Sequence, residues 1–265
     1  MRTTAFLQFG VLGDVIIATA VLCEYRMANP SEHITWILLE PYADTVMGNP
    51  DVDEVMPWPL KPHLTRRAQE RERWEEIKTY AARHFDLIIK PQVFPDHRWE
   101  DLAPMTLIEQ MFHHAGVKCP ARRELVVTSS PSPKPTPGRY VTCNASGNTQ
   151  PGVWSRYEYS QLARILRGRG ITLVVGDGDI PGALRFTGTI REWRSIIESA
   201  VAHIGLDSGG TWLAATTQTP QIVIHGSRPT VPTWLTRLKS AGVKDTNLIT
   251  EFTSPSVETV AAQLL

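Results

Sequence analysis

The sequence predicts an α/β protein with two domains, each built on a parallel β-sheet that helices cover on both faces. Short apolar segments of strand length alternate with helical segments through both halves of the chain, which is typical of such sheets. A proline-rich segment divides the 265 residues almost in half, and domains commonly contain about 100–200 residues. Glycine and aspartate follow several strands, at the edge where parallel sheets bind ligands.

The N-terminal half is expected to contain four strands. Thr4–Phe9 is short and apolar, Gly10–Asp14 forms a loop, and the helix Val15–Asn29 ends before a proline, which cannot continue a helix. Glycine, asparagine and proline separate the later segments. These are the strand His33–Leu39, the short helix Tyr42–Met47, the strand Val52–Met56, the charged amphipathic helix Arg66–His84, the strand Asp86–Lys90 and the helix Leu107–Ala115, which Gly116 closes.

The C-terminal half repeats this alternation. Apolar runs predict strands, and glycines near helix ends predict helix termination. The expected elements are the strand Arg139–Asn144, the helix Tyr157–Arg169 closed by Gly170, the strand Ile171–Val175, a short strand that Phe186 opens, the helix Glu192–Ala200, the strand His203–Leu206, the helix Thr211–Gln218, the strand Gln221–His225 and the helix Val257–Leu265.

Residues 131–138 are expected to link the two domains. Their alternating prolines cannot join a sheet or a helix interior and favour an extended connector. The N-terminal domain is then 1–130 and the C-terminal domain 139–265. Two Rossmann-like domains of this kind are expected to face each other across a cleft.

Charge and cysteine content narrow the classes of function. Lys and Arg number 27 and so do Asp and Glu, which gives no electrostatic case for general nucleic-acid or membrane binding. Cys23, Cys119 and Cys143 form no CxxC pair, which indicates buried thiols in a reducing cytoplasm. The apolar N-terminal stretch is interrupted at Gly10 and Gly13, unlike a signal peptide. No run approaches the ~20 apolar residues that span a bilayer.

The segment Asp207-Ser208-Gly209-Gly210 connects an apolar strand to a short helix. Glycines let a ligand approach the backbone, and N–H groups at a helix start can bind a diphosphate. Because an acid repels phosphate, Asp207 is expected to face sugar hydroxyls or to cap the helix. The alternative is an ordinary strand–helix turn. The segment has neither the Walker nor the GxGxxG pattern.

Phe9–Asp14 is the corresponding segment of the N-terminal half. Asp14 lies at the expected helix start, where it can cap the helix. Its other use is as a general base that takes a proton from an attacking hydroxyl. Position alone favours the cap.

Two further patterns have a structural and a functional interpretation. Asp177 and Asp179 have a D-x-D spacing that suits a divalent cation, but a glycine turn at a strand end is favoured. Trp154 and Trp212 adjoin the expected site loops, where aromatic faces suit sugar rings, although most tryptophans are packing residues.

The arginines of the charged helix form either a solvated face or a binding surface for an anionic acceptor. They are Arg66, Arg67, Arg71 and Arg73.

Four segments follow one another in the order Leu12–Ile16, Asn49–Val55, Phe186–Thr189 and Asp207–Gly209. This ordered set resembles the ADP-heptose:lipopolysaccharide heptosyltransferases, glycosyltransferase family 9. The resemblance covers nearly the whole chain. It implies a GT-B fold that binds the acceptor with its N-terminal half and a nucleotide-sugar with its C-terminal half. It also implies inversion at the anomeric carbon without a metal or other cofactor, and a donor that is ADP-linked in the family.

The resemblance also assigns roles to residues. Asp14 matches the general base, and the loops after the C-terminal strands match the donor site. N–H groups at Gly209–Thr211 are expected to stabilise the charge on the leaving diphosphate. The candidate donor-binding residues are Gly13, Ser146, Gly147, Trp154, Arg156, Thr187, Gly188, Thr189, Asp207, Ser208, Gly209, Gly210, Thr211 and Trp212. The candidate acceptor-binding residues are Arg66 and Arg67.

The sequence departs from the family pattern at two positions. Gly152 stands where the family commonly has a lysine beside the diphosphate, and Arg156 is the candidate to replace that charge. Trp212 stands where the family has a histidine, which resembles the protein O-heptosyltransferase branch. The acceptor expected is therefore a glycan, a lipid-linked sugar or a protein.

Three other functions stay open. The missing lysine is compatible with a nucleotide-sugar-binding protein without transferase activity. An oxidoreductase shares this fold class, although the sequence lacks GxGxxG. The basic strip Arg66–Arg73 leaves a modified nucleic acid as a conceivable acceptor.

The short N-terminal domain is compatible with an oligomer in which a second copy completes the acceptor site.

Overall fold

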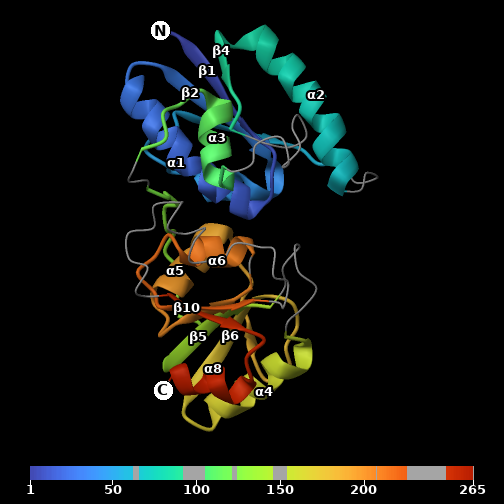
Figure 1. Cartoon of the computed structure of the whole chain (residues 1–265), viewed down its shortest axis with the longest axis vertical. Helices are drawn as coiled ribbons and strands as arrows, with labels where there is room; N and C mark the ends of the chain where they lie inside the picture. Colours follow the sequence, from blue (N-terminus) through green and yellow to red (C-terminus); the bar gives the residue numbers. More distant parts are fainter. Residues whose placement is uncertain are drawn as a thin grey trace. The chain divides into compact units, whose positions relative to one another are not determined.

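A computed structural model describes residues 1–61, 66–91, 105–120, 124–145, 154–206, 208–225 and 249–264, with the side chains of the charged helix from Glu72 onward. Two compact units are present, the first comprising Met1–Thr128 and the second beginning at Ser129. Figure 1 shows a sheet with helices in each unit.

The first unit is built on a four-stranded parallel sheet in the order β3-β2-β1-β4. Strands and helices alternate along the chain, so each helix carries the chain back to the end of the sheet where the next strand begins, and all strands run parallel. The strands are β1 Thr3–Gln8, β2 His33–Leu39, β3 Glu54–Trp58 and β4 Leu87–Ile89. The helices are α1 Leu12–Ala28, the 3₁₀ helix η1 Glu40–Val46, α2 Arg66–His84 and α3 Leu107–Ala115.

Side chains alternate between the two faces of β1, as strand geometry requires. Ala5 and Leu7 pack against Trp74 of α2. Phe6 points to the opposite face, where its ring lies 4.8 Å from that of Trp36. Helix α1 lies against this second face, and α2 lies on the other side of the sheet (Figure 1).

The second unit has a six-stranded parallel sheet in the order β10-β9-β8-β5-β6-β7. The central strands are the most buried, as expected when helices cover both faces. The strands are β5 Arg139–Asn144, β6 Ile171–Asp177, β7 Leu184–Arg185, β8 His203–Gly205, β9 Gln221–His225 and β10 Ile249–Thr253. The helices are α4 Arg156–Arg167, α5 Ile190–Glu198, α6 Gly209–Ala214 and α8 Val257–Gln263.

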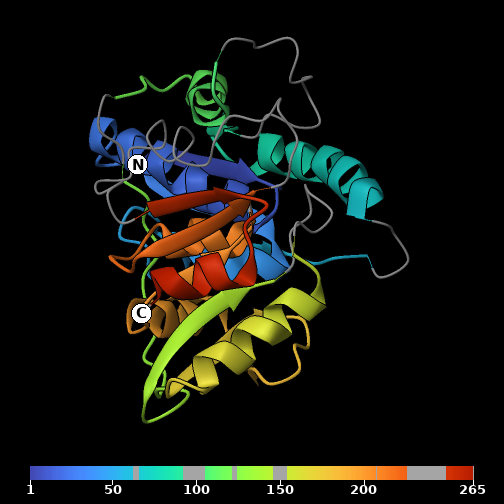
Figure 2. The same ribbon diagram turned by 60° about the horizontal axis from the view of Figure 1, so that its bottom comes forward.

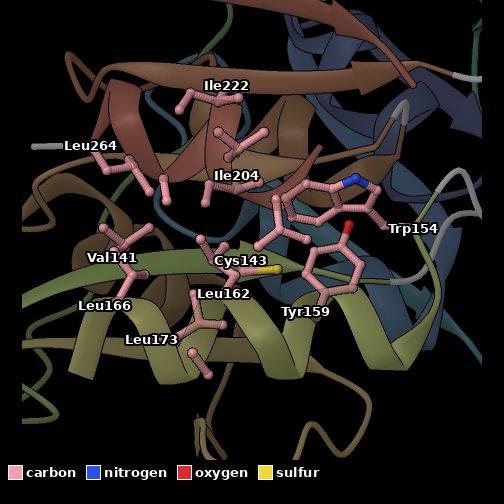
Figure 3. Close-up of a cluster of buried hydrophobic side chains, with 14 of the residues drawn as sticks. Val141, Cys143, Trp154, Tyr159, Leu162, Leu166, Leu173, Ile204, Ile222 and Leu264 are labelled. Carbon is pink, nitrogen blue, oxygen red and sulfur yellow. The ribbon is translucent and has the colours of Figure 1, made fainter. Parts of the chain in front are cut away.

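An apolar core lies between this sheet and the helices α4 and α8. Val141, Cys143 and Ile204 point from the sheet toward Leu162 of α4 and Val260 of α8, and Figure 3 shows the cluster. Helices α4 and α8 lie side by side in Figures 1 and 2.

The opposite face of the second sheet carries α5 and α6. The Tyr140 hydroxyl donates to the Ile196 carbonyl over 2.9 Å and joins β5 to α5.

The boundary between the units lies between Thr128 and Ser129. Ser130 accepts a 2.6 Å hydrogen bond from Ser195 of α5 at its carbonyl. The proline-rich residues 131–138 contain neither helix nor strand.

The predicted elements agree best where an apolar run is bounded by glycine, proline or charge. The bounds of five elements are as predicted, namely β2, α2, α3, β5 and β9. Gly116 adopts φ 65° after α3, the left-handed conformation that suits glycine at a helix end.

The other predicted elements differ from the structure at one or both ends, among them the starts of α1, α6 and β3. Helix α1 begins at Leu12, inside the predicted loop, and α6 begins at Gly209 instead of Thr211. Strand β3 begins at Glu54 because Asn49 forms a turn in which its side chain accepts the Asp51 N–H. Three further differences are of another kind: η1 has 3₁₀ geometry, strand β7 ends before Phe186, and strand β10 was not predicted.

Candidate functional site

Asp14 lies in the first turn of α1, at the carboxyl edge of the first sheet. Its Oδ2 accepts the Val11 N–H over 3.0 Å, so the carboxylate caps the helix start. A Cβ on Gly10 would lie 2.3 Å from Asp14 Oδ2. The loop therefore places the carboxylate directly against a residue that must be glycine. Position alone favoured Asp14 as the cap residue, but Val11 is the N-cap residue and Asp14 binds its N–H from the third helical position. A base role for Asp14 is compatible with this bond.

Gln8 is a residue of this loop that sequence reasoning missed. It is fully buried at the end of β1. Its Oε1 accepts the Gly10 N–H over 3.0 Å, and its Nε2 donates to the Asp14 carbonyl over 3.4 Å. A polar residue as the last member of an apolar strand was the available signal.

The segment Asn49–Val55, one of the four family-like segments, has a structural role. The Asp53 carboxylate accepts the Ile34 N–H over 2.7 Å and pairs with Arg26 over 2.5 Å. Burial opposes ionisation of Asp53, but these two partners outweigh it and lower its pKa. The segment therefore joins α1 to β2 at the amino edge of the sheet, away from Asp14.

Arg73 differs from the expected solvated arginine. It is 7% exposed, it donates to the Pro59 carbonyl and the Glu76 carboxylate, and its guanidinium lies 5.7 Å from the Trp58 ring centroid. Arg73 thus packs α2 against the end of β3. The side chains of Arg66, Arg67 and Arg71 lie outside the described residues.

In the second unit, the donor-loop candidates lie between β8 and α6. Asp207 lies outside the described residues. Ser208 precedes the first turn of α6, and its Oγ is buried and has no hydrogen-bond partner among the described residues. A buried hydroxyl without a partner costs free energy, so this hydroxyl is suited to a ligand.

Helix α6 packs closely on the sheet, and this limits which groups can reach a ligand. Thr211 is fully buried, its hydroxyl donates to the Leu206 carbonyl over 2.6 Å, and its N–H bonds to the Ser208 carbonyl. A Cβ on Gly210 would lie 2.1 Å from Asn144 Cγ. Of the three backbone N–H groups expected to bind a diphosphate, those of Gly209 and Gly210 remain candidates, because the N–H of Thr211 already bonds the Ser208 carbonyl.

Both tryptophans singled out from the sequence are buried. Trp154 is 3% exposed and its indole N–H donates to the Pro255 carbonyl over 3.0 Å. Figure 3 shows it beside Tyr159 in the core. Trp212 is 7% exposed. These positions are those of packing residues with a polar atom.

The segment Phe186–Thr189 leads into α5. Thr189 forms a complete capping box, because its side chain accepts the Glu192 N–H and the Glu192 carboxylate accepts the Thr189 N–H. The Phe186 ring stacks on Trp193 with centroids 5.0 Å apart. Thr187 and Gly188 are exposed, which leaves these two to contact a ligand.

Trp193 and Asn144 form a second feature that sequence reasoning missed. The Trp193 indole donates to Asn144 Oδ1 over 3.2 Å. A Cβ on Gly176 would lie 2.5 Å from the indole ring. The indole therefore lies in close contact with the end of β6, and Asn144 contacts both Trp193 and Gly210.

The two carboxylates of the D-x-D pattern have separate partners. Asp177 Oδ1 accepts the Ala145 N–H over 2.8 Å and so fixes the start of the loop after β5. Asp179 pairs with Arg156 at the surface over 2.7 Å. Gly178 between them has φ 76°, which agrees with the glycine turn. Ser146, Gly147 and Gly152 lie outside the described residues.

His203 is fully buried at the start of β8, and its Nδ1 lies 3.1 Å from the Thr142 hydroxyl. Burial lowers its pKa to about 3 because a charged imidazole loses its hydration there. His203 is therefore neutral near pH 7 and supplies no positive charge to a diphosphate.

No protein-family model and no curated protein sequence matches the chain. Solved heptosyltransferases share its fold. WaaC of E. coli, solved with ADP, is 14% identical with a TM-score of 0.66, covering 99% of this chain and 98% of that one. ADP-heptose LPS heptosyltransferase II of E. coli is 12% identical with a TM-score of 0.67, covering 100% and 97%. A family 9 glycosyl transferase from Veillonella parvula is 14% identical with a TM-score of 0.66, covering 99% and 97%.

These similarities extend over both units, so the predicted GT-B fold is confirmed. At such low sequence identities these similarities show the fold alone, and the reaction has to be argued from the residues of this chain. Within the described residues, the structure contains no helix with the length and apolar character needed to cross a membrane.

Proposed function

We propose that the protein is an inverting glycosyltransferase that moves a sugar from a nucleoside-diphosphate sugar to an acceptor hydroxyl. The observation that carries the proposal is the whole-chain likeness to heptosyltransferases, one of them solved with ADP. The Asp14 loop and the Ser208 loop lie at carboxyl edges of their sheets, where α/β proteins bind ligands. An ADP-linked heptose or a related sugar is the donor that these neighbours favour.

The second unit binds the donor in this proposal. The Ser208 hydroxyl and the N–H groups of Gly209 and Gly210 donate hydrogen bonds to the diphosphate. Such preorganised donors stabilise the negative charge that develops on the leaving group. Thr187 and Gly188, exposed before α5, contact the nucleoside.

The first unit binds the acceptor and supplies the base. The acceptor oxygen attacks the anomeric carbon as the bond from that carbon to the diphosphate oxygen breaks, which inverts the configuration. Asp14 takes the acceptor proton. The bond from the Val11 N–H to Asp14 Oδ2 keeps the carboxylate in one orientation during this transfer.

The proposal needs no metal. Hydrogen-bond donors at the start of α6 carry the charge stabilisation that a cation supplies elsewhere. Asp177 and Asp179 already have the partners Ala145 and Arg156. Arg156 is already paired with Asp179 at the surface, which weakens its case as a substitute for the family lysine.

A ligand screen followed by a turnover assay tests the proposal. Thermal shift with ADP-, UDP-, GDP- and CMP-sugars and NAD identifies the donor, since a ligand at 100 times its Kd stabilises by ~2.7 kcal/mol. Release of nucleoside diphosphate from the bound sugar, measured with added chelator, then tests metal-independent chemistry. A shift with NAD alone, or loss of turnover on chelation, contradicts the proposal.

A second candidate is a nucleotide-sugar-binding protein without transferase activity. The ion pair of Arg156 with Asp179 favours it, because the candidate replacement for the missing lysine is already paired with a carboxylate. Donor binding without nucleotide release against glycan, lipid-linked and protein acceptors supports this candidate over the first.

A further inference from the structure

The end of β1 is fixed from both faces of the sheet. Phe9 is fully buried and its ring lies 5.9 Å from that of Trp74 in α2. Gln8 points to the opposite face, toward α1, and is also fully buried. The loop that carries Asp14 therefore begins from a strand end with little freedom to move.

Gln8 uses both ends of its amide on this loop. Its oxygen accepts the Gly10 N–H over 3.0 Å, and its nitrogen donates to the Asp14 carbonyl over 3.4 Å. The side chain thus connects the residue that follows the strand with the first turn of α1. Both bonds lie in a part-buried region, where an unpaired backbone group is costly.

The two residues that Gln8 bonds are the two that define the position of the Asp14 carboxylate. A Cβ on Gly10 would lie 2.3 Å from Asp14 Oδ2, so the carboxylate is in direct contact with the Gly10 backbone. A shift of Gly10 would therefore displace the carboxylate. The Val11 N–H bond to Oδ2 fixes its orientation but not the position of the loop.

We propose that Gln8 is the positioning residue for the base of this enzyme: its amide fixes Gly10 and the first turn of α1, and through them the Asp14 carboxylate. This inference rests on the proposed function for its catalytic consequence. Gln8 touches neither donor nor acceptor. It acts through Asp14, so its loss lowers kcat and leaves the KM for the donor unchanged.

The test compares three variants of the full chain. Gln8→Met removes both hydrogen bonds at similar volume. Gln8→Glu keeps an oxygen to accept the Gly10 N–H and loses the donor to Asp14. Gln110→Met is the matched control, because Gln110 is a buried glutamine of the same unit whose amide donates to the Met105 carbonyl, far along the chain from the loop.

The catalytic measurement is ADP release from ADP-heptose in the absence of an acceptor, with water as the nucleophile. Misplacement of a catalytic group by about 1 Å can cost about 100-fold in rate. We therefore expect Gln8→Met to lower kcat by roughly 10- to 100-fold, Gln8→Glu to recover part of that loss, and Gln110→Met to match the wild type. A rise in the KM for the donor with unchanged kcat in Gln8→Met, or an equal loss of kcat in Gln110→Met, overturns the proposal.

A second readout does not depend on activity. Amide hydrogen exchange at Gly10 should be protected in the wild type, in Gln8→Glu and in Gln110→Met, and unprotected in Gln8→Met. Unchanged protection in Gln8→Met overturns the positioning role whatever the enzyme does. If the wild type releases no nucleoside diphosphate from any nucleotide-sugar of the ligand screen while Gly10 behaves as expected, the proposed function fails and the structural part of the inference stands.

Discussion

The two strand-end loops of the molecule use their polar groups in opposite ways. In the first unit, the groups of the β1–α1 loop bond one another: Val11 to Asp14 and Gly10 to Gln8. In the second unit, Ser208 precedes α6 with a buried hydroxyl that has no partner among the described residues. The first loop fixes a carboxylate, and the second leaves a hydroxyl without a described partner. Under the proposed function, this is the difference expected between a base and a binding site for an anion.

The largest expected effect removes the charge of Asp14 and keeps its shape. In Asp14→Asn, the side-chain oxygen can still accept the Val11 N–H, so the loop should keep its structure. General-base catalysis contributes ~10²–10⁴-fold, and we expect kcat for sugar transfer to fall by about that factor while donor affinity is unchanged. Full transfer rate in Asp14→Asn would leave the carboxylate with a capping role alone.

A methyl group at Gly210 should damage the donor loop. Its Cβ would lie 2.1 Å from Asn144 Cγ, so either the Asn144 side chain or α6 must move. Overpacking of this kind costs about 1–3 kcal/mol, which calorimetry would detect together with weaker donor binding. The control is Gly138→Ala, where a Cβ has nothing within 4 Å. Equal behaviour of the two variants would contradict the close packing of α6.

Acidification should destabilise the second unit through His203. Its pKa is lowered from 6.5 to about 3 in the folded chain, so protonation favours the unfolded chain. Stability is then present above pH 6.5 and is lost as the pH falls from 6.5 toward 3, by roughly 1.4 kcal/mol per pH unit. Urea unfolding at several pH values measures the slope. His203→Gln should flatten it, and an unchanged slope in that variant would place the acid sensitivity elsewhere.

The smallest expected effects distinguish the hydroxyl of Thr211, which supports the fold, from that of Ser208, which is proposed to bind the donor. Thr211→Val removes a buried hydrogen bond to the Leu206 carbonyl and should cost about 1 kcal/mol of stability. Ser208→Ala removes a hydroxyl without a described partner, so stability should stay the same or rise. Its cost should appear in donor affinity, as about a fivefold increase in Kd for ~1 kcal/mol. Calorimetry measures the stability of both variants, and titration measures their donor affinity. A loss of stability in Ser208→Ala, or a loss of donor affinity in Thr211→Val alone, would contradict this contrast.

Most of the fold could be predicted from the sequence because its signals are local. The strands β2, β5 and β9 are apolar runs between turn residues, and α3 is bounded by a capping threonine and a left-handed glycine. Strand β10 was missed because Ile249–Thr253 carries a central glutamate, and an edge strand needs no continuous apolar run. Asp14 was identified both as a cap and as a candidate base, and it accepts the N–H of the cap residue Val11.

The sequence by itself determined the α/β class, the alternation of elements and the loops that follow their strands, because these depend on residue order and on the periodicity of apolar side chains. The tertiary structure alone decided what each polar or aromatic residue touches. Arg73 and Trp154 are buried and paired, whereas Ser208 is buried without a described partner. Gln8 reaches Asp14 only because the end of β1 lies against the first turn of α1. Such contacts join groups that the chain order does not pair, so packing determines them.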